Sequence, residues 1–138
     1  MYKKVMVAIG NDETSPFALQ EALNIVSRDG AKLCIVHAVA EAEDGETKKN
    51  EQGVDLLARA TSAARGVAEV ETRLLRAVEE YGLNSIAEVV AGAAAEWKAD
   101  LLVVGTKGRR GLERLVIGSV AEKLVRTVEI SILLVRPH

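Results

Sequence analysis

Glycines and cationic side chains gather between residues 105 and 119, with a spacing that is suited to binding an anion. Gly105 and Gly108 are followed by nine intervening residues, then by Gly118 and Ser119. Glycine has no Cβ, so its backbone N–H can come close to an anion. The same segment contains Lys107, Arg109, Arg110 and Arg114, with Glu113 as its one acid. These residues predict a phosphate-binding loop.

The spacing differs from that of two common phosphate motifs. A P-loop, G-x-x-x-x-G-K-[ST], requires a Lys-Ser/Thr pair that does not follow these glycines. The dinucleotide motif G-x-G-x-x-G belongs after the first strand, where this sequence has Ile9-Gly10-Asn11-Asp12. A simpler interpretation stays open, in which the glycines only shape a surface loop and the three arginines form a solvated cluster.

The residues on either side of the glycines predict a strand before them and a helix after them. Leu101–Val104 is a continuous apolar run. From Ser119 to Thr127 the apolar residues recur with helical spacing, and we expect Val120, Leu124 and Val125 to face inward. A helix that begins here directs its free N–H groups and the positive end of its dipole at a bound anion.

Apolar runs alternate with segments of helical period along the rest of the chain, which is typical of a parallel α/β sheet. The other predicted strands are Val5–Ile9, Lys32–Val39, Val70–Val78 (a half-exposed edge strand) and Ile130–Val135. One helix is predicted from the N-cap Ser15, with Pro16 as its first residue, to Asp29-Gly30. The others are Val54–Arg65 and a helix that ends near Trp97 and is opened by a capping box of Ser85 and Glu88. The polar segment Glu41–Gly53 is predicted to be an exposed loop.

The alternation predicts one domain, residues 1–138, with a three-layer sandwich of helices around a five-stranded parallel sheet. In such folds, ligands bind beyond the carboxyl ends of the strands, where the strand order reverses. With the first strand central, the loops after Ile9 and Val104 flank one crevice. The phosphate-binding loop is therefore predicted to lie at the ligand site.

Composition limits the classes of partner. Apolar residues make up 49% of the chain and charged residues 28%, as in ordinary globular proteins. Aromatic residues, at 3%, are too few for a single-strand nucleic-acid platform, and the net charge of −2 gives no reason to bind nucleic acid or an anionic membrane. The apolar start of the chain is too short for a signal peptide or a membrane span, so a cytoplasmic location is expected.

Three single residues have mainly structural interpretations. Cys34 lies in an apolar run and is expected to be a buried small hydrophobe. His37 is expected to pack or to hydrogen bond at a strand end, because the other histidine is the terminal His138 and a histidine-rich metal site needs more. Trp97 is expected to be a partly buried residue at a helix end.

The order of elements, together with G-x2-G-x9-G-[ST], resembles the universal stress protein family over essentially the whole chain. Further segments similar to that family are Lys3–Ile9, Ala18-Leu19, Val36-His37, Ala99–Gly105 and Ile132–Pro137. The resemblance implies a parallel sheet of order 3-2-1-4-5, of the adenine nucleotide alpha hydrolase-like type. In the branch of the family with an intact motif, it also implies ATP binding.

Carried over by position, the resemblance implies a set of ATP contacts. For the adenosine part they are Ala8, Ile9, Val104 and Gly105, with the backbone of Ala38 at the adenine edge; for the phosphates they are Thr106, Gly108, Arg109, Gly118, Ser119 and Val120. In the ATP-binding branch an aspartate commonly follows the first strand, and here that position is Gly10. A role for Mg²⁺ or Mn²⁺ is therefore left open, as is the reach of Asp12, two residues further on.

Two functions of different classes compete. The first is a small ATP-binding regulatory protein of the stress response, with at most slow hydrolysis, since no general base stands near the motif. The alternative is a nucleotide-independent interaction module, favoured by Gly10 and by the apolar last strand, Ile130–Val135. Both include a homodimer paired through that strand, as the family implies. A phospho-acceptor receiver is excluded, because the third strand ends in Val78 without an aspartate.

Overall fold

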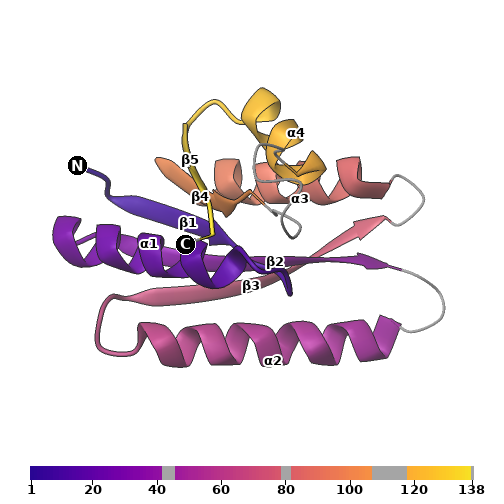
Figure 1. Ribbon diagram of the computed structural model, residues 1–138, viewed down its shortest axis with the longest axis horizontal. Coiled ribbons are helices and arrows are strands. Elements are labelled where there is room, and N and C mark those ends of the chain that lie inside the picture. The colour runs from indigo at the N-terminus through magenta and orange to yellow at the C-terminus, as the bar shows by residue number, and fades with distance from the viewer. Residues whose placement is uncertain (42–45, 79–81, 107–117, 138) are drawn as a thin grey trace.

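A five-stranded parallel sheet forms the centre of the protein, with the order β3-β2-β1-β4-β5 (Figure 1). The computed structural model describes residues 1–41, 46–78, 82–106 and 118–137. The elements are β1 (Lys4–Ala8), α1 (Ser15–Asp29), β2 (Lys32–Glu41), α2 (Glu46–Ala64), β3 (Val70–Val78), α3 (Gly82–Trp97), β4 (Leu101–Gly105), α4 (Ser119–Thr127) and β5 (Ser131–Val135). The predicted three-layer α/β sandwich and the predicted strand order, 3-2-1-4-5, are confirmed.

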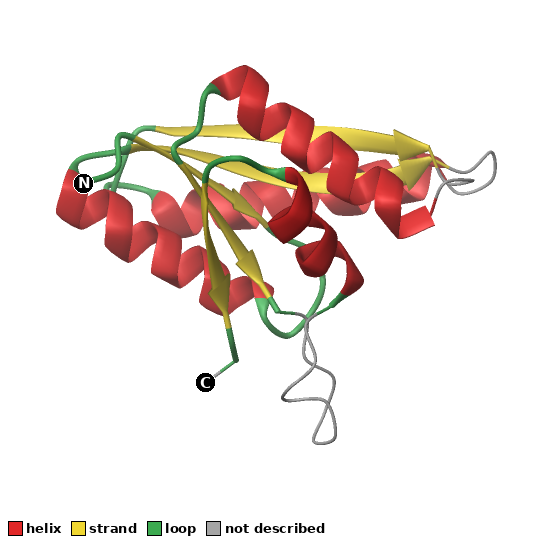
Figure 2. Ribbon diagram, turned by 90° about the horizontal axis from the view of Figure 1, so that it is seen from above, coloured by secondary structure: helices red, strands yellow, loops and turns green. Residues whose placement is uncertain are grey.

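The helices cover both faces of the sheet, which explains why the central strands contain continuous apolar runs such as residues 5–8 and 101–104. On one face α1 and α2 pack against Val5, Val7 and alternate residues of the neighbouring strands. On the other face α3 and α4 pack against Met6, Leu102 and their neighbours. Figure 2 shows the same layers turned by 90°, with β5 leading to the C-terminus. The two terminal strands of the order, β3 and β5, are the edges of the sheet.

Helix α2 corrects one prediction, because it begins at Glu46 and not at Val54. Most of the segment predicted as the exposed loop Glu41–Gly53 is therefore helical. The reason lies in tertiary packing: a Cβ on the buried Gly53 would lie only 2.7 Å from Leu74 Cδ1 and 3.1 Å from His37 Cδ2. A helix that packs through a glycine leaves no apolar periodicity in the sequence.

Other errors lie at helix ends. Helix α3 begins at Gly82, so the capping box predicted at Ser85 and Glu88 is wrong. The N-cap of α1 is Thr14 and not Ser15, although proline does lie in the first turn and the helix does end at Gly30, in the left-handed conformation. Helix α4 has the predicted bounds, but Val125 is 47% exposed and does not face inward. The inward positions of α4 are taken by Ala121 and Leu124.

A carboxylate fixes the start of α1 in place of a capping hydroxyl. Asp12 Oδ1 accepts hydrogen bonds from Thr14 N at 2.9 Å, Thr14 Oγ1 at 2.7 Å and Ser15 N at 2.9 Å. Asp12 Oδ2 accepts one from Ser15 Oγ at 3.0 Å, and Ser15 Oγ in turn accepts one from Gly10 N at 2.7 Å. Burial raises the pKa of Asp12, but the hydrogen bonds from Thr14 and Ser15 outweigh it, so the pKa lies below the usual 3.8.

The start of α1 also meets the end of β4. Thr14 is fully buried, and a Cβ on Gly105 would lie 2.6 Å from Thr14 Cβ and closer still to Thr14 Oγ1. Real Cβ contacts do not come that close, so only glycine allows the two segments to meet. Within the described part of the chain, no helix combines the length and the hydrophobicity needed to cross a membrane.

The contact between Gly105 and Thr14 yields a stability prediction. Gly105→Ala places a methyl group against the fully buried Thr14 and is expected to lower the free energy of unfolding by about 1–3 kcal/mol in urea titrations. The matched control is Gly92→Ala in α3, where an added Cβ meets nothing within 4 Å. That substitution is expected to be neutral or to stabilise by up to about 1 kcal/mol. Equal unfolding midpoints for Gly105→Ala and the wild type would contradict the close contact.

The Asp12 hydrogen bonds yield a pH prediction. Because the folded pKa of Asp12 is lowered, its ionised carboxylate stabilises the fold above the unfolded pKa of about 3.9. That contribution is lost as the pH falls through the folded pKa. Asp12→Asn is therefore expected to cost most stability near neutral pH and progressively less below about pH 4. Urea titrations of both proteins across this range provide the measurement, and a constant difference between them would contradict the lowered pKa.

Candidate functional site

A cleft lies at the carboxyl ends of β1, β2 and β4, where the strand order changes direction, as the sequence predicts. Its lining consists of Ala8, Ile9, Gly10, Asp12, Ser15, His37, Ala38, Ile86, Val90, Val104, Gly105, Gly118, Val120, Ala121 and Leu124. The cavity volume is about 180 Å³, below the roughly 300–1,000 Å³ typical of small-molecule sites. The space between the described residues is therefore smaller than a typical ligand site, and a ligand of nucleotide size would extend beyond it.

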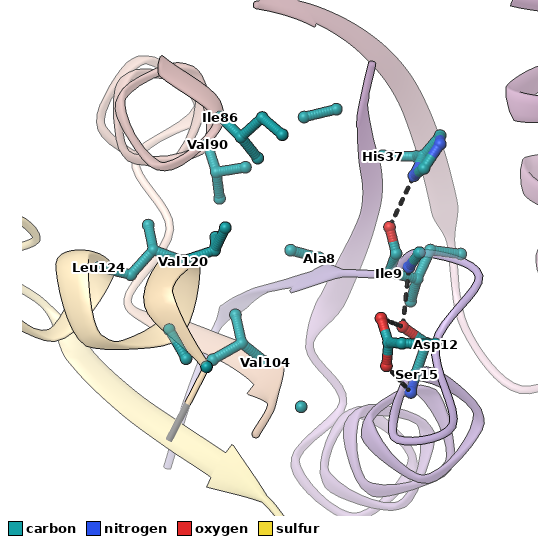
Figure 3. A pocket seen from close by; sticks show the side chains of 15 residues that line it. Ala8, Ile9, Asp12, Ser15, His37, Ile86, Val90, Val104, Val120 and Leu124 are labelled. Atoms are coloured by element: carbon teal, nitrogen blue, oxygen red, sulfur yellow. Dashed lines mark hydrogen bonds between the residues drawn. The ribbon is translucent and has the colours of Figure 1, made fainter. Parts of the chain in front are cut away.

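One wall of the cleft is apolar. It is built from Ile86 and Val90 of α3, Val104 of β4, and Val120 and Leu124 of α4 (Figure 3). Three residues of this wall also belong to the core beneath the cleft and are at most 4% exposed: Val90, Val104 and Leu124. Packing against that core holds the wall in place. An apolar wall of this kind suits a flat ring with little polarity on its faces.

The opposite wall is polar and comes from the end of β1, from His37 and Ala38 within β2, and from the start of α1 (Figure 3). His37 Nδ1 lies 2.8 Å from the carbonyl oxygen of Ile9. A carbonyl oxygen only accepts hydrogen bonds, so Nδ1 of His37 is protonated and donates a hydrogen bond to it. In the neutral ring, Nε2 is then a hydrogen-bond acceptor. The predicted hydrogen bond of His37 is confirmed, but His37 lies within β2, which runs on to Glu41, and not at a strand end as predicted. The hydrogen bond holds the backbone where β1 enters the cleft.

Asp12 supplies negative charge to this polar wall. It is half-buried and lines the cleft beside Gly10 and Ser15. The hydrogen bonds from Thr14 and Ser15 that lower its pKa keep it ionised at neutral pH. An ionised carboxylate accepts hydrogen bonds and repels anions, so this wall favours a neutral donor and disfavours phosphate.

The N-terminus of α4 lies at the same cleft, because Gly118 and Val120 both line it. Gly118 is the N-cap, with an extended backbone, and its N–H donates to the carbonyl of Thr106 at 2.8 Å. The first N–H groups of a helix have no partner within the helix, and they carry the positive end of its dipole. The cleft therefore has the partial positive charge of a helix N-terminus at α4 and a full negative charge at Asp12.

The structure places the predicted site residues in three groups. Those that line the cleft are Ala8, Ile9, Ala38, Val104, Gly105, Gly118 and Val120. Thr106 is buried behind the lining, where its N–H donates to the carbonyl of Val135, and Ser119 is an exposed residue at the start of α4. Gly108 and Arg109 lie outside the described residues, together with Lys107, Arg110, Glu113 and Arg114.

Several lining residues are not in the predicted set. Ile86, Val90, Ala121 and Leu124 are apolar helix residues, and their spacing does not distinguish them from core residues. The sequence indicates Ser15 only as a helix cap and His37 only as a structural residue of the second strand. For Asp12, a sequence signal does exist. An aspartate commonly accepts hydrogen bonds from the N–H groups two and three residues further along the chain, which here belong to Thr14 and Ser15.

The remaining candidates lie away from the cleft. Cys34 is fully buried, as predicted, and burial raises the pKa of its thiol to about 11. Trp97 is 8% exposed at the end of α3, and Lys4 Nζ lies 4.5 Å from the centre of its ring. Among the residues that the structure describes, no cluster of three or more His, Cys, Asp or Glu side chains could hold a metal ion.

Comparison with known proteins agrees with this architecture. The sequence profile of the universal stress protein family matches residues 1–136. A relative from Staphylococcus saprophyticus, named as a universal stress protein, is 32% identical over 98% of this chain and 84% of its own length.

Solved structures show the same fold. A universal stress protein in complex with cAMP superposes with a TM-score of 0.77, at 23% identity over 99% of both chains. One from Archaeoglobus fulgidus in complex with dAMP gives a TM-score of 0.70, at 17% identity over 97% of this chain and 98% of that one. With a match along almost its whole length, this chain belongs to the universal stress protein family.

Proposed function

We propose that this protein binds an adenine nucleotide, ATP, in the cleft between β1 and β4, and that it acts as a small cytoplasmic regulator in the stress response. The observation that carries the proposal is the meeting of an apolar wall and a helix N-terminus in one cleft. An adenine ring suits the first and a phosphate group suits the second. The relatives whose structures contain cAMP and dAMP support an adenine nucleotide.

The proposed orientation follows from the charges of the cleft. The base packs between Ile86, Val90 and the end of β1, with the backbone of Ala38 at its edge. The phosphates extend toward Gly118 and Ser119 and away from Asp12, and the residues between Thr106 and Gly118 complete their binding. We assign Gly108 and Arg109 to contact with the phosphates. The buried Thr106, whose N–H donates to Val135 and whose carbonyl accepts from Gly118, supports this part of the site from behind.

Any Mg²⁺ or Mn²⁺ would arrive with the nucleotide. The carboxylate that lines the cleft among the described residues is Asp12, and its Oδ1 already accepts three hydrogen bonds. Hydrolysis is expected to be slow at most, because His37 Nδ1 is engaged with Ile9 and Asp12 with the start of α1.

Calorimetric titration with ATP and AMP tests the proposal. Binding of ATP is expected. Ser119→Ala removes a hydroxyl donor and is expected to weaken binding about 3- to 10-fold, since a donor to an ionised phosphate contributes more than a neutral hydrogen bond. Gly118→Ala keeps the backbone N–H but adds a Cβ at the start of α4, and it is expected to weaken binding by hindering the approach of the phosphates. Ser62→Ala, on the exposed surface of α2, is the matched control and should bind ATP like the wild type. If millimolar ATP gives neither heat nor a thermal shift, the proposal is wrong.

A second candidate, a nucleotide-independent homodimeric interaction module, draws support from β5. This strand lies at the edge of the sheet, and its apolar residues Ile132, Leu133 and Leu134 are only half-buried. Pairing with the same strand of a second copy, about a two-fold axis, would cover them.

Light scattering during size exclusion tests the dimer. A mass of twice the 14.8 kDa of one chain is expected at micromolar concentration, with or without ATP. A dimer without any ATP binding would favour the interaction module over the nucleotide-dependent regulator. A mass near that of one chain would contradict pairing through β5.

A further inference from the structure

The loop between β1 and α1 presents a charged side-chain acceptor to the cleft. Four of its N–H groups are already engaged within the protein: Ile9 with the carbonyl of Val36, Gly10 with Ser15 Oγ, and Thr14 and Ser15 with Asp12 Oδ1. This side of the cleft is therefore unlike the N-terminus of α4. What it presents to a ligand is the carboxylate of Asp12.

The two oxygens of that carboxylate differ in their remaining capacity. Oδ1 accepts three hydrogen bonds, from Thr14 N, Thr14 Oγ1 and Ser15 N. Oδ2 accepts one hydrogen bond from the described residues, donated by Ser15 Oγ at 3.0 Å. An ionised carboxylate oxygen accepts at least two hydrogen bonds, so Oδ2 keeps room for a second donor.

Gly10 leaves the space beside this oxygen open. A Cβ at position 10 would lie 3.2 Å from Asp12 Oδ2. Apart from the adjacent chain residues, no other atom of the described residues comes within 4 Å of that point. Both Gly10 and Asp12 line the cleft, so the opening left by the missing side chain is an opening toward a ligand.

We propose that Asp12 determines ligand specificity in this cleft, with Oδ2 accepting a hydrogen bond from a neutral donor on the nucleoside. The inference rests on the proposed function and deepens it. An adenine nucleoside carries two kinds of such donor, the sugar hydroxyls and the 6-amino group of the base. The negative charge of Asp12 excludes the phosphates from this end of the site, which places the nucleoside here and the phosphates at α4.

Two substitutions separate this role from a purely structural one. Asp12→Asn preserves the shape of the side chain: its oxygen can keep the three bonds at Oδ1, while its NH₂ group replaces Oδ2 and donates to Ser15 Oγ. Gly10→Ala leaves Asp12 charged but places a methyl group beside Oδ2. Asp55→Asn, on α2 and away from the cleft, makes the same change of charge and serves as the control.

The experiment compares dissociation constants for ATP, for 2′,3′-dideoxy-ATP and for purine riboside triphosphate, which lacks the 6-amino group. In the wild type and in Asp55→Asn, one analogue is expected to bind at least about tenfold more weakly than ATP, as for loss of a hydrogen bond to a charged group. The quantity compared between variants is the ratio of the dissociation constant of that analogue to the dissociation constant of ATP. In Asp12→Asn and Gly10→Ala this ratio is expected to fall to within about threefold. The analogue that is affected identifies the donor.

The ratio distinguishes the possible outcomes. A change of structure alone would weaken all three ligands together and leave the ratio as in the wild type. If ATP binds but neither analogue is weaker, or if the ratio survives Asp12→Asn and Gly10→Ala, the role of Asp12 is overturned and nucleotide binding stands. If the wild type binds none of the three, both proposals are overturned. Circular dichroism checks that each variant is folded.

Discussion

The close approach between the start of α1 and the end of β4 determines the geometry of the cleft. Thr14 is fully buried against Gly105, at a separation that no side chain at position 105 would permit. Asp12 holds the other side of this contact, since it accepts the N–H groups of Thr14 and Ser15. The carboxyl ends of β1 and β4 thereby lie side by side, with Ala8 paired to Val104, and they form the floor between the two walls of the cleft.

This constraint explains the electrical asymmetry of the cleft. The hydrogen bonds that fix the start of α1 consume backbone donors on the β1 side and leave an ionised carboxylate there. On the β4 side, the chain returns at Gly118 to begin a helix whose N–H groups are unused within the helix itself. A ligand with a neutral end and an anionic end therefore has one favourable orientation, with its neutral end beside Asp12.

Glycine is needed at positions 105, 118 and 53 for different physical reasons. The spacing of the glycines in the sequence does not distinguish these reasons. Gly105 is required by its contact with Thr14, whether or not a phosphate approaches it. Gly118 caps α4 and binds Thr106, which agrees with the prediction of a helix beginning at that point. Gly53 allows α2 to lie against His37 and Leu74, and this packing hid the first half of α2 from any search for apolar periodicity.

The sequence by itself determined the parallel sheet, its order by way of the family resemblance, and the strands that border the cleft. Runs such as Leu101–Val104 are buried on both faces and are recognisable without knowledge of their neighbours. Only the tertiary structure decided that Asp12, Ser15 and His37 share a wall of the cleft and that Ile86 and Leu124 face them. The reason is physical: hydrophobic burial repeats along the chain with a local period, whereas hydrogen bonds such as His37 to Ile9 and close contacts such as Gly105 to Thr14 join residues that are brought together by folding.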